Sequence, residues 1–204
     1  MIEVPVFNQD GQKVETIQVD EQLLGGEVNK ALLKQAIVMY HANLRQGTAQ
    51  TQARGDVAGS TRKLFKQKGT GNARTGGIRN PIKKGGGHAK QTYPTEFRQS
   101  LNVKARRIAR DSALLSKLQS AEVRVVDKLA LSEPKTKQIA KLFKALGIER
   151  TCCLATAEHD PMVYRSARNI DRCVVTTVRQ LNAWDIMQKR TLLVTKDGLQ
   201  KLLA

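Results

Sequence analysis

The chain has 204 residues and a formal net charge of +17, with 35 Lys and Arg residues against 18 Asp and Glu residues. This length suits one ordinary domain with an extension, or two small domains. No apolar run approaches the ~20 residues that a membrane span needs, and residues 1–5 lack the basic start and apolar core of a signal peptide. We therefore expect a soluble, cytoplasmic protein with no membrane partner.

The first 44 residues predict a β-hairpin followed by a helix. Two β-prone runs, 4–7 and 13–19, flank the turn sequence Asn-Gln-Asp-Gly at 8–11. Residues 29–44 then show the spacing of an amphipathic helix, whose apolar face we expect to pack against a core. That face consists of Leu32, Leu33, Ala36, Ile37, Tyr40 and Leu44.

Residues 45–98 differ from the rest of the chain in charge and in glycine content. Ten of the 15 glycines lie there, and twelve cations stand against two acids, Asp56 and Glu96. The net charge is −3 over residues 1–44, +14 over 45–110 and +6 over 111–204. The middle third therefore supplies most of the positive field, which favours docking of a polyanion at one place.

The basic stretch has too few apolar residues to hold a fold of its own. Ordering the backbone costs ~1–2 kcal/mol per residue, and repulsion among the cations opposes collapse. Either the stretch is disordered or an anionic partner orders it, and the charge favours nucleic acid over a plain flexible tether. Its large apolar residues are Val57, Leu64, Phe65, Ile78, Ile82, Tyr93 and Phe97.

A helix is predicted directly after the basic stretch. Its apolar face contains Leu101, Ala105, Ile108 and Leu115, and its opposite face carries Arg106, Arg110 and Lys117. A cationic face on a surface helix is usually only solvated. Because this helix follows the basic stretch without a break, we interpret the face as a continuation of the binding surface.

The remaining residues alternate between strands and helices. Strands are expected at 123–127, 152–157, 173–178 and 191–195, and helices at 132–146, 162–169, 184–188 and 196–203. This order predicts an α/β fold with a mainly parallel sheet that helices cover on both faces. We expect residues 1–44 and 99–204 to form one globular body, with residues 45–98 as an extended basic RNA-binding loop.

The sequence contains no recognisable catalytic constellation. Gly71 and Gly76 have P-loop spacing, but Gly77 and Ile78 follow where Lys and Ser or Thr are required. The dinucleotide fingerprint and the G-x-S-x-G elbow are missing too. A nucleotide-using RNA-modifying enzyme remains an alternative, and it predicts a ligand pocket at the carboxyl ends of the strands.

The cysteines and histidines do not have metal-ligand spacing. Cys152 and Cys153 are adjacent on a predicted strand, so their side chains point to opposite faces, and we interpret them and Cys173 as buried thiols. His41, His88 and His159 are scattered. We expect no metal, no cofactor and no small-molecule substrate.

Several segments resemble the family of the fourth protein of the large ribosomal subunit. The specific core is Lys-Leu-Phe-Lys-Gln-Lys-Gly-Thr-Gly-Asn-Ala-Arg at 63–74, followed by Gly-Ile-Arg-Asn-Pro at 77–81 and Gly-Gly-Gly at 85–87. The similarity continues through 101–109 and 112–114. The sequence departs from the family pattern in three places: Phe65 stands where Trp is typical, Asn72 stands where Arg is usual, and the segment 88–94 differs from the expected Gly-Pro-x-Pro-Arg-like segment.

The resemblance implies a structural, non-catalytic constituent of the large subunit. In such proteins a globular α/β body sits on the outer side of the particle, and the protein binds large-subunit ribosomal RNA with a long loop that threads the RNA toward the peptide exit tunnel, beside neighbouring large-subunit proteins. The resemblance also implies a role in subunit assembly. Some members repress their own operon, so an RNA- or DNA-binding regulator with a basic arm is the alternative.

The expected RNA-binding residues are the cations of the loop and of the following helix, with the glycines that let the backbone approach phosphates. The loop aromatics either stack on bases or pack against the loop itself. The expected residues are Arg45, Arg54, Arg62, Lys63, Phe65, Lys66, Lys68, Gly69, Gly71, Arg74, Arg79, Lys83, Lys84, Gly85, Gly86, Gly87, His88, Lys90, Arg98, Lys104, Arg106, Arg107, Arg110 and Lys117.

Overall fold

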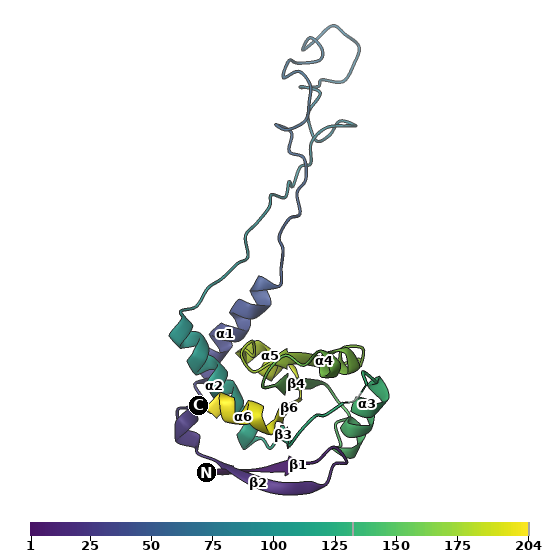
Figure 1. Cartoon of the computed structure of the whole chain (residues 1–204). Helices are drawn as coiled ribbons and strands as arrows, with labels where there is room; N and C mark the ends of the chain where they lie inside the picture. Colours follow the sequence, from purple (N-terminus) through teal and green to yellow (C-terminus); the bar gives the residue numbers. More distant parts are fainter. Residues whose placement is uncertain (132, 204) are drawn as a thin grey trace. The chain divides into compact units, whose positions relative to one another are not determined.

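The fold is a six-stranded, mostly parallel sheet with helices on both faces, seen in a computed structural model that describes residues 1–131 and 133–203 (Figure 1). The chain divides into two compact units: Met1–His41 together with the residues from Gln99 onward, and Ala42–Arg98. The sheet and its helices belong to the first unit. The predicted α/β class is confirmed.

The strand order is β2-β1-β3-β6-β4-β5. β1 and β2 pair antiparallel, as the predicted hairpin requires, whereas β1–β3, β3–β6, β6–β4 and β4–β5 pair in parallel. The strands span Ile2–Phe7 (β1), Lys13–Val19 (β2), Val123–Val126 (β3), Cys152–Thr156 (β4), Cys173–Thr177 (β5) and Thr191–Thr195 (β6).

The helices agree closely with the sequence pattern, with two differences. The helix expected over 132–146 begins at Thr136, after Pro134, and Ser132 lies outside the described residues. A short 3-10 helix was not expected; it starts where the Asp20 side chain accepts a hydrogen bond from the backbone N–H of Gln22. The helices span Glu21–Leu24 (η1), Lys30–Asn43 (α1), Val103–Gln119 (α2), Thr136–Ala145 (α3), Pro161–Ala167 (α4), Ala183–Gln188 (α5) and Lys196–Leu203 (α6).

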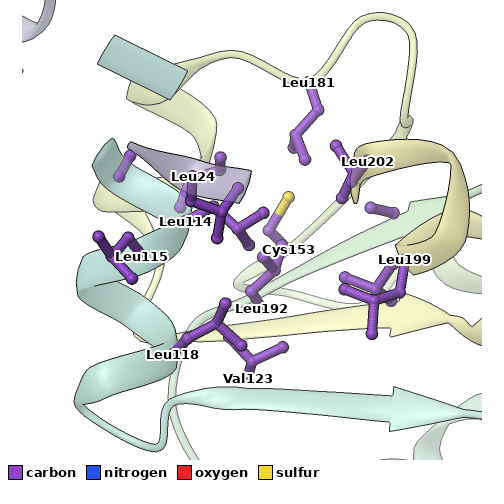
Figure 2. Packing of buried hydrophobic residues seen from close by; sticks show 14 of the residues in the cluster. Leu24, Leu114, Leu115, Leu118, Val123, Cys153, Leu181, Leu192, Leu199 and Leu202 are labelled. Atoms are coloured by element: carbon purple, nitrogen blue, oxygen red, sulfur yellow. The ribbon is translucent and has the colours of Figure 1, made fainter. Parts of the chain in front are cut away.

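Alternate residues of the central strands point into two separate apolar clusters. Leu192 and Val194 of β6 pack with residues of α1, α2, α5 and α6, whereas Leu193 packs with residues of α3 and α4. Figure 2 shows the first cluster, where Leu192 lies among leucines of α2 and α6. The sheet is therefore buried on both faces, which accounts for the continuous apolar runs in the sequence.

The adjacent cysteines point to opposite faces, as predicted. Cys152 belongs to the α3/α4 cluster and Cys153 to the other. Burial raises the pKa of the Cys153 thiol to about 12 and that of the half-buried Cys173 thiol to about 11. These thiols therefore remain protonated and poorly nucleophilic at neutral pH.

The predicted faces of α2 are only partly right. Ile108, expected on the buried face, is 52% exposed, and Lys117, expected on the solvent face, is 6% exposed. The carboxyl-terminal half of α2 is buried nearly all round, from Ser112 to Leu118, whereas its first two turns are largely exposed. A single helical stripe cannot describe both environments. Among the described residues, no helix is long and apolar enough to span a bilayer.

Candidate nucleic-acid interface

Residues 45–98, all of them described, form neither helix nor strand. Two legs of the chain run beside each other in this unit and continue into turns and bends (Figure 1). Backbone hydrogen bonds join the legs from Thr95 to Gly47 at 3.0 Å, from Thr51 to Thr92 at 2.9 Å and from His88 to Gln52 at 2.9 Å. A few hydrogen bonds, and no helix or strand, connect the two legs of the segment.

Two close backbone approaches within the unit require glycine. A methyl group at Gly87 would overlap the backbone of Arg54, and one at Gly86 would overlap the carbonyl oxygen of Asn80. Ala53 beside this crossing is 7% exposed and is the one buried apolar residue of the Ala42–Arg98 unit. The steric need for Gly86 and Gly87 thus arises within the protein itself.

Arg79 holds two parts of the unit together. Its guanidinium donates to the carbonyl oxygen of Gly59, and its own carbonyl accepts from the N–H of Gly87 at 3.1 Å. Arg79 is only half-buried, yet its Nε is enclosed and has no hydrogen-bond partner among the residues that the structure describes. The Arg79 side chain therefore makes contacts inside the unit, although the sequence analysis grouped Arg79 with the cations expected to bind RNA.

The other cations of the segment face solvent. Lys83 is half-buried like Arg79, and the remaining ten of the twelve are exposed. Within the described chain none of the twelve pairs with a carboxylate. Exposed cations gathered without carboxylate partners make the segment strongly electropositive, a property typical of nucleic-acid-binding surfaces.

The aromatic residues of the segment divide into two kinds. The guanidinium of Arg45 lies 3.7 Å from the ring centroid of Phe97, a cation–π contact within the protein. Phe65 is 43% exposed and Tyr93 is 52% exposed. Phe97 thus packs against its own unit, whereas Phe65 and Tyr93 are open to solvent.

The start of α2 carries a second group of cations. Lys104, Arg106 and Arg107 are exposed, and the half-buried Arg110 pairs with Asp111 at 2.8 Å. The exposed face of these first turns therefore combines positive charge with the uncovered side chain of Ile108. This is a surface suited to a polyanionic partner.

Lys117 is not part of that exposed group. Its ammonium donates to a carboxylate oxygen of Glu122 at 2.6 Å and to the carbonyl oxygen of Arg190 at 2.9 Å. The hydrogen bond from Lys117 holds the pKa of Glu122 below its usual value. We had expected Lys117 to face solvent because its helical position matches Arg106 and Arg110, but the charge is satisfied internally.

The groove at the carboxyl ends of β4 and β6 is poorly suited to a phosphate. The groove found there is lined by Ala157, Glu158, Asp197, Gln200 and Lys201, so it contains two carboxylates and one cation. In the described residues no group of three His, Cys, Asp or Glu side chains could hold a metal ion. This groove gives no support to the nucleotide-using alternative.

Residues 17–204 match the model of the ribosomal protein L4/L1 family. The chain belongs to the ribosomal protein L4/L1 family. Similar relatives include the large ribosomal subunit protein uL4 of Symbiobacterium thermophilum, 42% identical over 99% of this chain and 98% of that protein. The uL4 of Rhodopirellula baltica is 39% identical over 99% of this chain and 91% of its own length.

Membership of the L4/L1 family confirms the resemblance that the 63–74 segment carried. The uL4 protein of one Dehalococcoides mccartyi strain is likewise 39% identical over 98% of this chain and 96% of that protein. The similarity thus spans both the sheet-bearing unit and the basic segment, so the exposed cations of Ala42–Arg98 are an integral part of an L4/L1 chain.

Proposed function

We propose that the chain is a structural constituent of the large ribosomal subunit that binds large-subunit ribosomal RNA. The observation that carries the proposal is the run of exposed, unpaired cations in a segment with one buried apolar residue. Such a segment cannot offset its own ordering entropy, and phosphates supply the missing interaction. Its place of action is the cytoplasmic ribosome, and it has no catalytic role.

The loop is proposed to act mainly by neutralising phosphates. Its cations displace counterions from the RNA, and shape, more than base sequence, sets the register. We assign this role to the exposed cations and assign base stacking to Phe65. The cations concerned are Arg54, Arg62, Lys63, Lys66, Lys68, Arg74, Lys84, Lys90 and Arg98, with Lys104, Arg106 and Arg107 on α2.

The tip of the loop is proposed to extend through the RNA toward the peptide exit tunnel, near other large-subunit proteins. In this scheme the loop becomes fully ordered during subunit assembly, when ribosomal RNA closes around it. When ordering and binding are coupled, part of the favourable interaction energy offsets the entropy that the loop loses. The many cations in the segment supply interaction energy beyond that cost.

Neutralising three loop lysines tests the proposal. The Lys63→Gln/Lys66→Gln/Lys68→Gln variant should make the plot of log affinity for large-subunit RNA against log salt shallower by about 2–3. The matched control is Lys137→Gln/Lys141→Gln/Lys144→Gln on the exposed side of α3, which removes the same charge. Equal slopes for the two variants would refute the assignment of the loop.

A competition experiment between RNAs distinguishes the structural role from the regulator alternative. A regulator with a basic arm must bind a short mRNA or DNA site as tightly as it binds ribosomal RNA. If excess large-subunit RNA displaces such a short site while the reverse competition fails, the structural role is supported. Co-sedimentation with large subunits at high salt provides the corresponding test in cells.

A further inference from the structure

The amino edge of the parallel sheet brings together charged residues that are far apart in the sequence. β4 pairs from its first residue with the first residues of β5 and β6. The residues that directly precede these three strands therefore form one row along the edge. They are Thr151, Arg172 and Arg190.

Hydrogen bonds fix this row. The backbone N–H of Arg190 donates to the hydroxyl oxygen of Thr151 at 2.9 Å, and the N–H of Cys152 donates to the carbonyl oxygen of Arg172 at 2.9 Å. Arg172 also has a φ of 65°, a left-handed conformation that is unfavourable for a non-glycine residue. Both arginines are therefore held at defined backbone positions.

The row borders an open groove of about 600 Å³. Its lining includes five cations, Lys117, Arg150, Arg172, Lys189 and Arg190, against the single carboxylate of Glu122, which leaves a charge of +4. Met187 is the only large apolar side chain in that lining, and no aromatic ring contributes to it. A protein-binding surface normally has an apolar or aromatic centre, whereas this lining is cationic and polar.

The one carboxylate in the groove is already neutralised. Glu122 accepts from the buried Lys117 at 2.6 Å and pairs with Arg190 at 2.8 Å. Within the described chain, Arg150 and Lys189 have no ion-pair partner. The Arg172 guanidinium has only the exposed Asp171 at 3.5 Å. Positive charge therefore remains available to a ligand.

We propose that this groove is a second phosphate-binding site, in which Arg150, Arg172, Lys189 and Arg190 bind the phosphodiester backbone of RNA. Arginine forks suit phosphate oxygens, and Lys189 adds a point charge. Lys117 is a positioning residue, since it holds Glu122 and the Arg190 carbonyl. The inference rests on the proposed ribosomal RNA partner but concerns a surface separate in sequence from the loop and α2.

Charge neutralisation in the full chain tests the site. Arg150→Gln/Lys189→Gln removes two cations that form no ion pair within the described chain, although Lys189 also acts electrostatically on Asp185. The control is Lys137→Gln/Lys144→Gln, which removes the same charge from exposed positions on α3. We expect the first variant to bind large-subunit RNA about tenfold more weakly near physiological salt, with a salt slope shallower by about 1–2. The control should retain wild-type affinity, and both should keep the wild-type melting temperature. Equal affinities for the two variants would overturn the proposal.

Lysine footprinting provides a readout that needs no variant. Bound large-subunit RNA should slow acetylation of Lys189 severalfold and leave Lys137 unchanged. If Lys189 stays equally reactive, or if a polyglutamate peptide protects it better than RNA does, the proposed site is wrong. If the Lys63/Lys66/Lys68 variant loses binding but the Arg150/Lys189 variant does not, only this second site is rejected. If every variant binds RNA as the wild type does, the ribosomal RNA role itself is rejected.

Discussion

The pair formed by Lys117 and Glu122 is the most enclosed ion pair in the described chain, with side-chain exposures of 7% and 18%. Burying a charge costs free energy unless partners replace its hydration. Lys117 has the carboxylate and the Arg190 carbonyl, and Glu122 has a second cation in Arg190. The network therefore stabilises the fold only while all three members are present.

Replacing Lys117 with methionine should lower the free energy of unfolding by about 2–3 kcal/mol, because Glu122 loses its shortest hydrogen bond in a mostly enclosed site. Urea denaturation measures the change. The control is Lys141→Met, which breaks an exposed contact of 3.5 Å to Asp10 and should cost less than about 0.5 kcal/mol. Similar costs for both variants would contradict the role given to this pair.

Glu122 should also make stability depend on pH. Its pKa is lowered in the folded state by the Lys117 hydrogen bond, so its contribution is present above the unfolded-state pKa and is lost as pH falls through the folded-state pKa. Glu122→Gln lacks this titration. The stability gap between wild type and Glu122→Gln, measured from pH 7 to pH 3, should shrink on acidification; a constant gap would exclude Glu122 as its source.

At the scale of single elements, α2 combines an enclosed half with an open half. Leu115 is fully buried, whereas Ile108, two turns earlier, is half exposed. Leu115→Ala should cost about 2–5 kcal/mol through lost burial and the cavity left behind. Ile108→Ala should stay within roughly 0.5 kcal/mol of wild type. Thermal or urea unfolding measures both changes in stability. A large loss of stability for Ile108→Ala would mean that the first turns of α2 are packed.

The point where the two legs cross in the Ala42–Arg98 unit can be tested by a single substitution. Gly87→Ala would place a methyl group on the Arg54 backbone, so hydrogen exchange at the His88 amide, which donates to Gln52, should quicken. Gly76→Ala is the control, because its φ is not positive and its added carbon would meet nothing within 4 Å. Unchanged exchange in Gly87→Ala would show that the crossing does not depend on the glycine.

The sequence predicted most elements because their signals are local. β6 and α6 have the predicted bounds, and Asn182 caps α5 by accepting from the N–H of Asp185 at 2.9 Å. The faces of α2 could not be predicted, because what covers a helix depends on partners distant in the sequence. The prediction that Leu44 lies on a packing face was wrong for the same reason, since Leu44 is 69% exposed.

At the scale of the whole molecule, charge is the property that the sequence reveals best. The candidate interface was predictable because +14 over residues 45–110 requires no knowledge of contacts. The internal roles of Arg45, on Phe97, and of Arg79, on Gly59, were not, since each depends on the chain folding back. The amino-edge row was missed as well, although its arginines directly precede strands of a predicted parallel sheet.

Deleting residues 50–95 should leave the sheet-bearing unit folded, because both apolar clusters lie in that unit. In the full chain the hydrogen bond from Thr95 to Gly47 holds the two legs together beside the points of deletion. We expect a cooperative urea transition of the shortened chain, and a loss of affinity for large-subunit RNA far greater than that of the Arg150/Lys189 variant. A shortened chain that melts without cooperativity would mean that the segment stabilises the body.

The position of β6 in the sheet has a consequence for biosynthesis. β6 joins β3 to β4 at the middle of the sheet, yet it is the last of the six strands to leave the translating ribosome. Until it arrives, the nascent chain exposes two unpaired apolar strand edges, which are prone to intermolecular pairing. Newly made chains should therefore require a chaperone until Thr191–Thr195 closes the gap.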